Sequence, residues 1–357
     1  MVRRERLDSI SDKIGGMIKM RLKSLSLNTG YDAAVKWRMT DICNYSCSYC
    51  SRAKTLKEYD AGKINAENEE LKSVAQKINA LLEKSGFKNI KIDLVGGEVT
   101  LLDLPLILDA ISTEKVKEYN ITTNFSQSAE YYIQLAKKIP LSMTASLHEQ
   151  HTDLNVFFEK ARAVKEAGVL KDFKCETVSC TGNQDIIKIF EEKCGENGLE
   201  YIIDRDKNNI EKTQNISSRR EKNLYIAEFT DGTKKEFPSK AALLETFIDT
   251  RLCEGRRINT KGLICTFSYN FIYIDKDTVL GRAKENSGCK NRIPIDKFEI
   301  LPPAKCQIDY CSLCGFFSLY APEDEELEEH SEILAIDETE TDDEDEEDVE
   351  ECASENQ

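Results

Sequence analysis

Three cysteines lie within eight residues of this chain: Cys43, Cys47 and Cys50, in the string CNYSCSYC. Closely spaced thiolates bind either iron–sulfur clusters or zinc. A fully ligated [4Fe–4S] cluster takes four thiolates, so a loop with only three would leave one iron open for chemistry. A zinc site completed by one further Cys or His is the alternative that the spacing alone leaves open.

A second motif, Gly96-Gly97-Glu98, follows about fifty residues later. Residues 33–39 are predicted to form a strand that runs into the cysteine loop, and residues 90–95 a strand that ends at the glycines. Glycine permits close approach of the backbone to a ligand, and a carboxylate accepts hydrogen bonds from an ammonium group. A purely structural metal site needs no second ligand-binding loop, so the pair of motifs favours a site that binds a metal and a ligand.

The cysteine string resembles the CxxxCxΦC signature of radical S-adenosylmethionine (SAM) enzymes, in which Tyr49 fills the aromatic place Φ. The Gly96-Gly97-Glu98 string matches the GGE motif of the same family. The resemblance implies that the three cysteines hold a [4Fe–4S] cluster, that SAM chelates its fourth iron, and that the GGE string contacts the methionine end of SAM. It also implies cleavage of SAM to a 5′-deoxyadenosyl radical, with electrons from a donor such as flavodoxin or ferredoxin.

Strand-like and helix-like patterns alternate between residues 31 and 205, which predicts a parallel sheet covered by helices. One predicted helix has apolar residues at helical spacing before Gly86, and another runs from the N-cap Asp153 to Gly168. The six predicted strands span residues 33–39, 90–95, 117–122, 141–147, 172–178 and 199–204. Six such units resemble the partial (β/α)6 TIM barrel of radical SAM cores, an α/β fold that binds ligands at the C-terminal ends of its strands.

The same predicted edge carries further candidate site residues. Asn124 follows the third strand and Ser146 ends the fourth, where related enzymes contact the ribose or carboxylate of SAM. A turn or helix cap is the alternative for Asn124. His148 and Glu176 are the candidate catalytic residues, because histidine transfers protons near neutral pH and Glu176 lies near the end of the fifth strand. Hydrogen bonding to neighbours at the barrel mouth is the alternative for His148.

A second group of cysteines lies nearer the C-terminus: Cys253, Cys265, Cys289, Cys306, Cys311 and Cys314. With the strand-like string FIYIDKD and Gly281 between them, they resemble the twitch or SPASM auxiliary-cluster regions of radical SAM enzymes. The resemblance implies one auxiliary [4Fe–4S] cluster held by Cys265, Cys306, Cys311 and Cys314, with Cys289 as the substitute ligand. A zinc ribbon is the alternative. The remaining Cys175, Cys180 and Cys194 are predicted to be core or incidental thiols.

The predicted organisation has five parts. They are an N-terminal extension (1–30), the barrel core (31–205), a connecting hairpin region (206–250), a small cysteine-rich α+β domain (251–321) and an acidic tail (322–357). The hairpin is predicted from apolar alternation around Asp231-Gly232. Residues 323–357 contain 20 Asp or Glu and no Lys or Arg, so we expect this tail to be disordered.

The formal net charge of −16 comes from the tail, because residues 1–322 carry 49 basic against 45 acidic groups. The small positive charge of this body, without a dense basic run, argues against nucleic acid as the substrate. No apolar run approaches the roughly 18 residues of a membrane span, and the N-terminus lacks an apolar signal core. We therefore expect a cytoplasmic protein whose thirteen cysteines are metal ligands or free thiols rather than disulfides.

These expectations combine into one hypothesis: a SAM-dependent radical oxidoreductase or maturase that abstracts hydrogen from an enclosed substrate. Family analogy favours modification of a peptide or protein side chain. One alternative is the dehydrogenation or rearrangement of a small sugar, nucleotide or amino-acid-like molecule. The other is an iron–sulfur or zinc protein without SAM chemistry.

Overall fold

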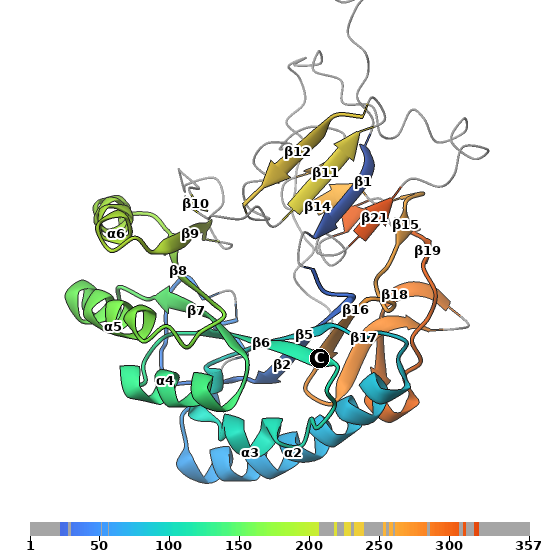
Figure 1. Cartoon of the computed structure of the whole chain (residues 1–357), viewed down its shortest axis with the longest axis horizontal. Coiled ribbons are helices and arrows are strands. Elements are labelled where there is room, and N and C mark those ends of the chain that lie inside the picture. Colours follow the sequence, from blue (N-terminus) through green and yellow to red (C-terminus); the bar gives the residue numbers. More distant parts are fainter. Residues whose placement is uncertain are drawn as a thin grey trace, which may run out of the picture.

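The structure is a computed structural model in which a helix-covered sheet lies beside a smaller group of strands (Figure 1). It describes residues 22–27, 30–50, 52–55, 57–206, 218–219, 225–229, 232–238, 253–254, 257–259, 261–283, 286–306, 310–311 and 318–320. The predicted acidic tail, with Cys352, lies outside the described residues.

The larger sheet has ten strands in the order β10-β9-β8-β7-β6-β5-β2-β16-β17-β18. Its first seven strands are β10 (Ser218–Arg219), β9 (Glu200–Arg205), β8 (Asp172–Ser179), β7 (Leu141–Leu147), β6 (Val116–Thr123), β5 (Ile90–Gly96) and β2 (Ala33–Thr40). The last three are β16 (Phe271–Asp275), β17 (Thr278–Ala283) and β18 (Asn286–Pro294). The run from β9 to β2 is parallel throughout. All six predicted strands are therefore present, in the predicted parallel arrangement.

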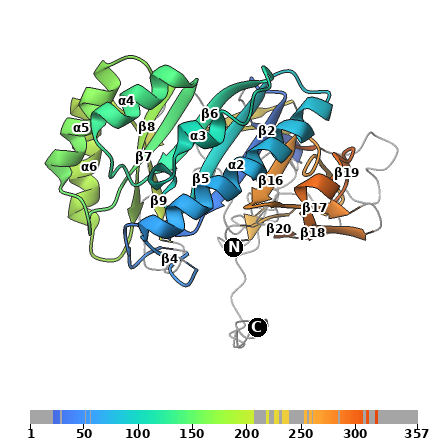
Figure 2. The same ribbon diagram turned by 90° about the horizontal axis from the view of Figure 1, so that it is seen from below.

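Within the described residues, five helices lie on the outer side of this sheet, which is seen from below in Figure 2. They are α2 (Ala61–Lys84), α3 (Leu104–Leu108), α4 (Ala129–Lys138), α5 (Leu154–Glu166) and α6 (Gln184–Glu196), with short 3-10 turns η1 (Val99–Leu101) and η3 (Ile295–Lys297). Along the chain, the five α-helices come after β2, β5, β6, β7 and β8, and within the described residues β9 has no helix after it. None of these described helices is long and apolar enough to cross a membrane.

Two of the helices confirm the sequence patterns in detail. The six apolar positions expected to face the core of α2 are all buried: Leu71, Val74, Ala75, Ile78, Leu81 and Leu82. Asp153 caps α5, since its carboxylate accepts from the backbone N–H groups of Asn155 and Val156 at 2.8 and 3.2 Å. Gly168 follows with a φ of +63°, a conformation that glycine adopts without steric cost.

The two faces of the larger sheet differ in chemistry. Residues such as Val35, Ile92 and Met143 point into the apolar core that the helices share. The alternate positions carry polar groups, and strand register places Ser146 of β7 directly beside Glu176 of β8 on this second face. Successive side chains of a strand point to opposite faces. Ser146 and Glu176 therefore share the polar face, which lies away from the helices.

The smaller sheet joins distant parts of the chain in the order β12-β11-β1-β21-β15-β19. Its strands are β1 (Leu22–Leu27), β11 (Tyr225–Phe229), β12 (Lys234–Phe237), β15 (Ile264–Cys265), β19 (Ala304–Lys305) and β21 (Ser318–Tyr320). The predicted hairpin is present as the antiparallel pair β11 and β12. Shorter pairings involve β13 (Cys253–Glu254), β14 (Arg257–Asn259) and β20 (Tyr310–Cys311), and also β3 (Ile42–Cys43) and β4 (Lys57–Glu58).

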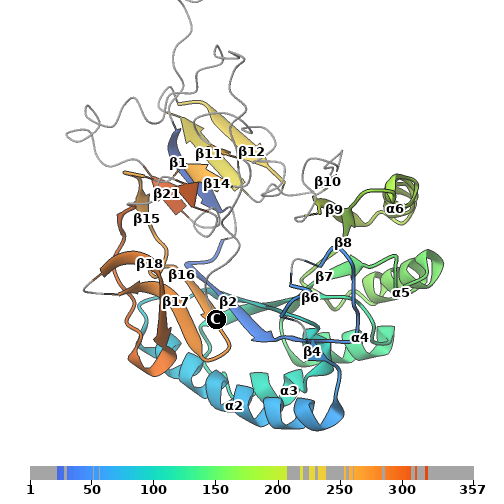
Figure 3. The ribbon, with the colours of Figure 1, turned by 180° about the vertical axis from the view of Figure 1, so that it is seen from behind.

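The C-terminal region also contributes to the larger sheet, which the sequence patterns do not indicate. The string FIYIDKD contains β16, which pairs in parallel with β2, as seen from behind in Figure 3. Trp37 Nε1 donates to the Lys276 carbonyl at 3.0 Å, and the Lys276 amide donates to the Arg38 carbonyl at 2.8 Å. Arg38 and Asp275 also form an ion pair. The turn after β16 therefore braces the strand that leads into the cysteine loop.

Candidate functional site

The cysteine loop leaves the C-terminal end of β2 and passes through the two-residue strand β3. Cys47 is buried, with 6% of its surface exposed, while Cys43 and Cys50 are half-buried, and all three are free thiols. The backbone N–H of Tyr45 points to Cys43 Sγ at 3.4 Å, and that of Arg52 points to Cys50 Sγ at 3.4 Å. Backbone donors aimed at sulfur favour the thiolate form, which is the form that binds metal.

The three sulfurs influence one another electrostatically. Burial raises the pKa of Cys47 to about 12, and the nearby Cys43 and Cys50 add to this effect, against a hydrogen bond from Tyr49. Burial also raises the pKa of Cys43. Within the described residues, no three His, Cys, Asp or Glu side chains converge so as to hold one metal ion. An iron–sulfur cluster does not need that convergence, because its thiolates bind separate irons.

Gly96 and Gly97 hold the end of β5 against the stem of the cysteine loop. The amide of Gly97 donates to the Thr40 carbonyl and the amide of Glu98 to the Ile42 carbonyl, each at 2.8 Å. A Cβ added at Gly97 would lie 2.2 Å from the Ile42 oxygen, and one at Gly96 would lie 2.5 Å from the Thr40 oxygen. The packing of the chain itself therefore requires glycine at both positions, and the close approach to a ligand stays a prediction.

Glu98 is fully buried and joins the ends of two strands. Its Oε1 accepts from the amide of Thr100 at 2.9 Å, from Thr100 Oγ1 at 2.5 Å and from Thr123 Oγ1 at 2.8 Å. Its Oε2 accepts from the amide of Asn124 at 2.5 Å. Burial raises the pKa of Glu98, and these hydrogen bonds oppose the rise. The carboxylate is thus turned into the protein, where it ties the end of β5 to the end of β6.

Asn124 connects the end of β6 to the cysteine loop. Its Nδ2 donates to Asn44 Oδ1 at 2.7 Å and lies 3.9 Å from Cys43 Sγ. Its Oδ1 accepts from the amide of Ser126 at 3.1 Å, which is the side-chain turn expected of an asparagine at a strand end. Asn124 therefore forms the turn that was the alternative role, and it also contacts the cysteine loop, while its contact with SAM stays a prediction.

The segment after β7, residues 148–152 (HEQHT), packs directly on the cysteine loop, and we call it the histidine loop. The ring of Tyr45 stacks on His151 with centroids 4.6 Å apart and an interplanar angle of 14°. The Tyr45 hydroxyl lies 3.0 Å from Thr152 Oγ1, and the Ser46 amide donates to His151 Nε2 at 3.3 Å. Two further hydrogen bonds join Ser48 to Gln150, at 2.9 and 2.7 Å. Sequence reasoning missed this docking, although the tyrosine between two cysteines and the two nearby histidines were visible signals.

His148 approaches the cysteine loop most closely. Its Nδ1 lies 3.3 Å from Cys47 Sγ and 3.0 Å from the hydroxyl of Tyr49, which in turn donates to Glu149 Oε2 at 3.2 Å. Burial, aided by His151, lowers the pKa of His148 to about 4, so its imidazole is neutral at pH 7. Tyr49, the aromatic residue of the cysteine string, is itself buried. The structure therefore brings the candidate residues Tyr49 and His148 together with a metal-ligand candidate.

Ser146 and Glu176 lie beside the histidine loop, on neighbouring strands. Ser146 stands two residues before His148, and its register partner is Glu176. Both side chains are half-buried. The polar face of the sheet therefore reaches the cysteine loop through the end of β7.

The C-terminal cysteines are only partly described. Cys265 on β15 and Cys306 after β19 are both buried, and the Cys306 amide donates to the Leu263 carbonyl at 2.8 Å. Strand register places the backbones of Cys253 and Cys311 on either side of Ile258. Cys289 lies in β18, while its side chain, those of Cys253 and Cys311, and all of Cys314 are outside the described residues. Two of the four predicted auxiliary ligands thus lie close along neighbouring strands, Cys265 on β15 and Cys306 directly after β19, and the cluster itself stays a prediction.

The three remaining described cysteines differ in their surroundings. Cys175 and Cys194 are fully buried in the apolar core, as predicted. Cys180 is half-buried, and its Sγ lies 3.7 Å from Glu149 Oε1. Cys180 is therefore a neighbour of the histidine loop and not a core thiol.

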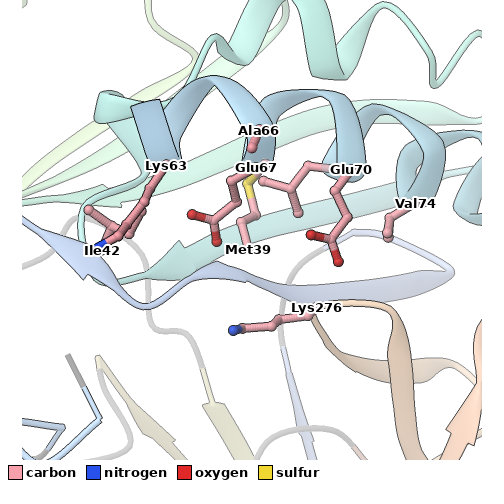
Figure 4. Close-up of a pocket in the computed structure, with 9 residues that line it drawn as sticks. Met39, Ile42, Lys63, Ala66, Glu67, Glu70, Val74 and Lys276 are labelled. Atoms are coloured by element: carbon pink, nitrogen blue, oxygen red, sulfur yellow. The ribbon is translucent and has the colours of Figure 1, made fainter. Parts of the chain in front are cut away.

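A cavity of about 240 Å³ lies between α2 and β2. Figure 4 shows Glu67 and Glu70 of α2 on the side that faces Met39 and Lys276. Lys276 Nζ also pairs with Asp41 Oδ2 at 3.1 Å. None of the predicted site residues lines this cavity. It adjoins the stem of the cysteine loop and not the sulfurs.

No family model matches this sequence, and no curated protein matches it. Among solved structures, the chain is 15% identical to anSMEcpe with bound AdoMet and a Cp18Cys peptide, covering 48% of this chain and 50% of that chain at a TM-score of 0.37. It is 16% identical to SuiB from Streptococcus suis, covering 72% and 63% of the two chains at a TM-score of 0.41.

Coproporphyrinogen III oxidase (HemN) from Escherichia coli, described as a radical SAM enzyme, is 14% identical over 51% of this chain and 49% of that chain, at a TM-score of 0.38. The chain spans about half the length of the anSMEcpe structures that it matches. Because these TM-scores are below 0.5, a function cannot be assigned from the structural similarity and has to be argued from the residues of the site. The chain is thus similar in part to solved structures that include a radical SAM enzyme.

Proposed function

We propose that this protein is a radical SAM enzyme. The observation that carries the proposal is the contact between two motifs on neighbouring parallel strands. The loop with Cys43, Cys47 and Cys50 leaves the end of β2, and the Gly96-Gly97-Glu98 string at the end of β5 bonds to its stem. Ligands of parallel α/β sheets bind beyond the C-terminal ends of the strands, and both motifs lie at that edge.

The donor set fits a [4Fe–4S] cluster. Three thiols on one loop are soft ligands of the kind that iron–sulfur clusters select. Each sulfur has a nitrogen within 3.4 Å: the amides of Tyr45 and Arg52 for Cys43 and Cys50, and His148 Nδ1 for Cys47. When bound, the cluster and SAM supply the 5′-deoxyadenosyl radical, while the protein positions the reactants and excludes side reactions.

We propose three roles for the residues around the cysteine loop: positioning of the loop, contact with SAM and proton transfer. Glu98, Asn124 and the two glycines fix the loop against the strand ends, and we propose that the GGE backbone, Tyr49, Asn124 and Ser146 line the SAM position. We propose Glu176 as the candidate for proton transfer to or from the substrate, because it lies beside Ser146 on the polar face of the sheet, whereas His148 contacts the cysteine loop. The substrate would then lie against the polar face of the sheet, beside Ser146.

The leading substrate class is a peptide or protein side chain. SuiB has been solved bound to its precursor peptide SuiA, and anSMEcpe with a Cp18Cys peptide. Family analogy supports the same class here, with a small sugar, nucleotide or amino-acid-like molecule as the alternative. We further propose a cytoplasmic enzyme reduced by flavodoxin or ferredoxin.

A second, auxiliary [4Fe–4S] cluster is proposed at Cys265, Cys306, Cys311 and Cys314, with Cys289 as the substitute ligand. Its support is the adjacency of the two buried thiols, since Cys265 pairs in register with Ala304, two residues before Cys306. An iron count after removal of the first three cysteines tests this proposal. About four irons per chain should remain if one auxiliary cluster is present.

Reductive cleavage of SAM tests the proposed function. The protein is reconstituted anaerobically with iron and sulfide, reduced, and supplied with SAM, and 5′-deoxyadenosine is measured. We expect release from the wild type and from Cys180→Ala, and no release from the triple variant Cys43→Ala, Cys47→Ala, Cys50→Ala. Absence of 5′-deoxyadenosine from a wild-type protein that carries its cluster would reject the enzyme.

A zinc site is the second candidate, and one distance favours it. The 3.3 Å between His148 Nδ1 and Cys47 Sγ is compatible with two ligands of one tetrahedral zinc, which binds nitrogen at about 2.0 Å and sulfur at about 2.3 Å. A Cys₃His site would need the three cysteines to move closer together, because no three such side chains converge on one position within the described residues. Tight binding of one zinc that depends on His148, with no cluster formed on reconstitution, would support this candidate over the radical enzyme.

A further inference from the structure

We propose that His148 is a positioning residue that donates a hydrogen bond from Nδ1 to the Cys47 thiolate and thereby raises the reduction potential of the cluster on the cysteine loop. The inference rests on the proposed function, because it needs the cluster. It goes further by giving a specific electronic role to the histidine loop, residues 148–152. The contact that suggests it is the 3.3 Å between His148 Nδ1 and Cys47 Sγ.

The hydrogen-bond network assigns the proton to Nδ1. The Tyr49 hydroxyl has a single proton and three polar neighbours, Glu149 Oε2 at 3.2 Å, His148 Nδ1 at 3.0 Å and the Cys47 sulfur, so Tyr49 does not decide the tautomer. A cluster-bound thiolate has no proton of its own. The 3.3 Å contact between Cys47 Sγ and His148 Nδ1 therefore requires a proton on the histidine nitrogen and selects the Nδ1–H tautomer.

The histidine ring is held in place on several sides. It lies parallel to Tyr49, with centroids 6.0 Å apart and an interplanar angle of 8°, and it meets the edge of Tyr45 at 5.9 Å. The amides of His151 and Thr152 donate to the His148 carbonyl at 2.9 and 3.0 Å, which fixes the turn. The donor is therefore oriented before any cluster is reduced, so little reorganisation accompanies electron transfer.

The expected effect has a definite sign. Reduction adds negative charge to a cluster and its thiolates, and a hydrogen bond to a ligand sulfur stabilises the more negative state. The reduction potential of an iron–sulfur cluster depends on such hydrogen bonds. Removing the donor should therefore lower the midpoint potential and make the cluster harder to reduce.

Three variants separate the hydrogen bond from other roles of the loop. His148→Leu removes the donor, and His148→Asn places an amide nitrogen near the position of Nδ1. Tyr45→Phe is the matched control, since it removes a hydroxyl that contacts Thr152 and keeps the ring that stacks on His151. The midpoint potential is measured by a redox titration followed by electron paramagnetic resonance without SAM, and iron content is measured in parallel.

We expect His148→Leu to keep the iron content of the wild type and to shift the midpoint potential to a lower value. His148→Asn should have a midpoint potential close to that of the wild type, because its amide nitrogen replaces the lost donor. Tyr45→Phe should match the wild type. An unchanged potential in His148→Leu would overturn the proposal, and so would loss of iron in both His148 variants, which would make the residue a ligand. A wild-type protein that forms no cluster would reject both proposals, whereas normal 5′-deoxyadenosine release with an unchanged potential rejects only this one.

Discussion

Gly97 and Ile42 approach so closely that a Cβ on Gly97 would lie 2.2 Å from the carbonyl oxygen of Ile42. The next amide along the chain, that of Glu98, donates to the same oxygen at 2.8 Å. Ile42 precedes Cys43 directly. The end of β5 and the first cysteine of the loop are therefore positioned by one backbone contact that leaves no space for a side chain.

Gly97→Ala should displace the cysteine loop. The added methyl group meets backbone atoms that cannot rotate away, and forced overpacking of this kind costs about 1–3 kcal/mol. We expect lower stability in urea and fewer irons retained after reconstitution. Gly86→Ala is the matched control, because a Cβ there meets nothing within 4 Å. Equal iron retention and equal stability in the two variants would show that the close contact does not constrain the loop.

Glu98→Gln should destabilise the protein even though the shape of the side chain is kept. The four hydrogen bonds to this carboxylate all come from donors, and an amide NH₂ group in place of one oxygen cannot accept. A buried donor left without its partner costs about 1–3 kcal/mol. The free energy of unfolding is measured in urea. Glu83→Gln serves as control, since 53% of the Glu83 side chain is exposed. If Glu98→Gln lost no more free energy of unfolding than Glu83→Gln, the buried hydrogen bonds of Glu98 would not stabilise the protein as we propose.

Lys91 and Glu118 should make stability depend on pH. Lys91 Nζ lies 2.9 Å from Glu118 Oε1. Although burial opposes it, the charge of Lys91, together with hydrogen bonds from Tyr31 and Lys91, holds the pKa of Glu118 below its usual value. The contribution of this pair is therefore complete above the usual glutamate pKa of about 4.3 and is lost as the pH falls through the depressed value.

Lys91→Met tests this dependence. At pH 7 we expect the variant to be less stable by about 2 kcal/mol, because hydrogen bonds to charged groups contribute about 1.5–3 kcal/mol. The difference from the wild type should shrink as the pH is lowered from 5 to 3, since Glu118 then becomes protonated in both proteins. Urea unfolding curves at several pH values provide the measurement. A difference in stability that stays constant between pH 5 and pH 3 would contradict the lowered pKa of Glu118.

Tyr45→Ala should expose Cys47 in the metal-free protein. Cys47 is 6% exposed, while Cys43 and Cys50 are half-buried, so alkylation should modify Cys47 most slowly. Loss of the Tyr45 ring removes the stacking on His151 that holds the two loops together. We expect a severalfold faster alkylation of Cys47, followed by mass spectrometry, and little change in Tyr45→Phe. Equal rates for Cys47 in all three proteins would mean that the stacking does not shield it.

Local elements were predicted correctly from the sequence where a single residue type has a single structural role, such as a helix cap or a turn. Asp153 caps a helix, Gly168 adopts a positive φ, and the apolar stripe around Val74 and Ile78 is buried. The alternation of strand-like and helix-like segments also located the six parallel strands. These features depend on neighbours within a few residues, which a single sequence reveals.

The parts that were not predicted depend on contacts between distant residues. Pairing of β16 with β2 joins segments more than 230 residues apart in the sequence. The inward turn of Glu98 depends on donors from Thr123 and Asn124, on another strand. The docking of His148 on Cys47 likewise spans 101 positions. Composition and periodicity do not encode such pairings, so the candidate residues were identified without the network that connects them.

The most direct test of the account asks whether the three-cysteine loop holds a cluster with an iron open to SAM. Electron paramagnetic resonance of the reduced, reconstituted protein is recorded with and without SAM, with Cys180→Ala as the control for thiol loss. We expect SAM to change the cluster signal in the wild type and in the control. No SAM-responsive signal should appear when Cys43, Cys47 and Cys50 are replaced by alanine. A wild-type cluster signal that is the same with and without SAM would contradict the account.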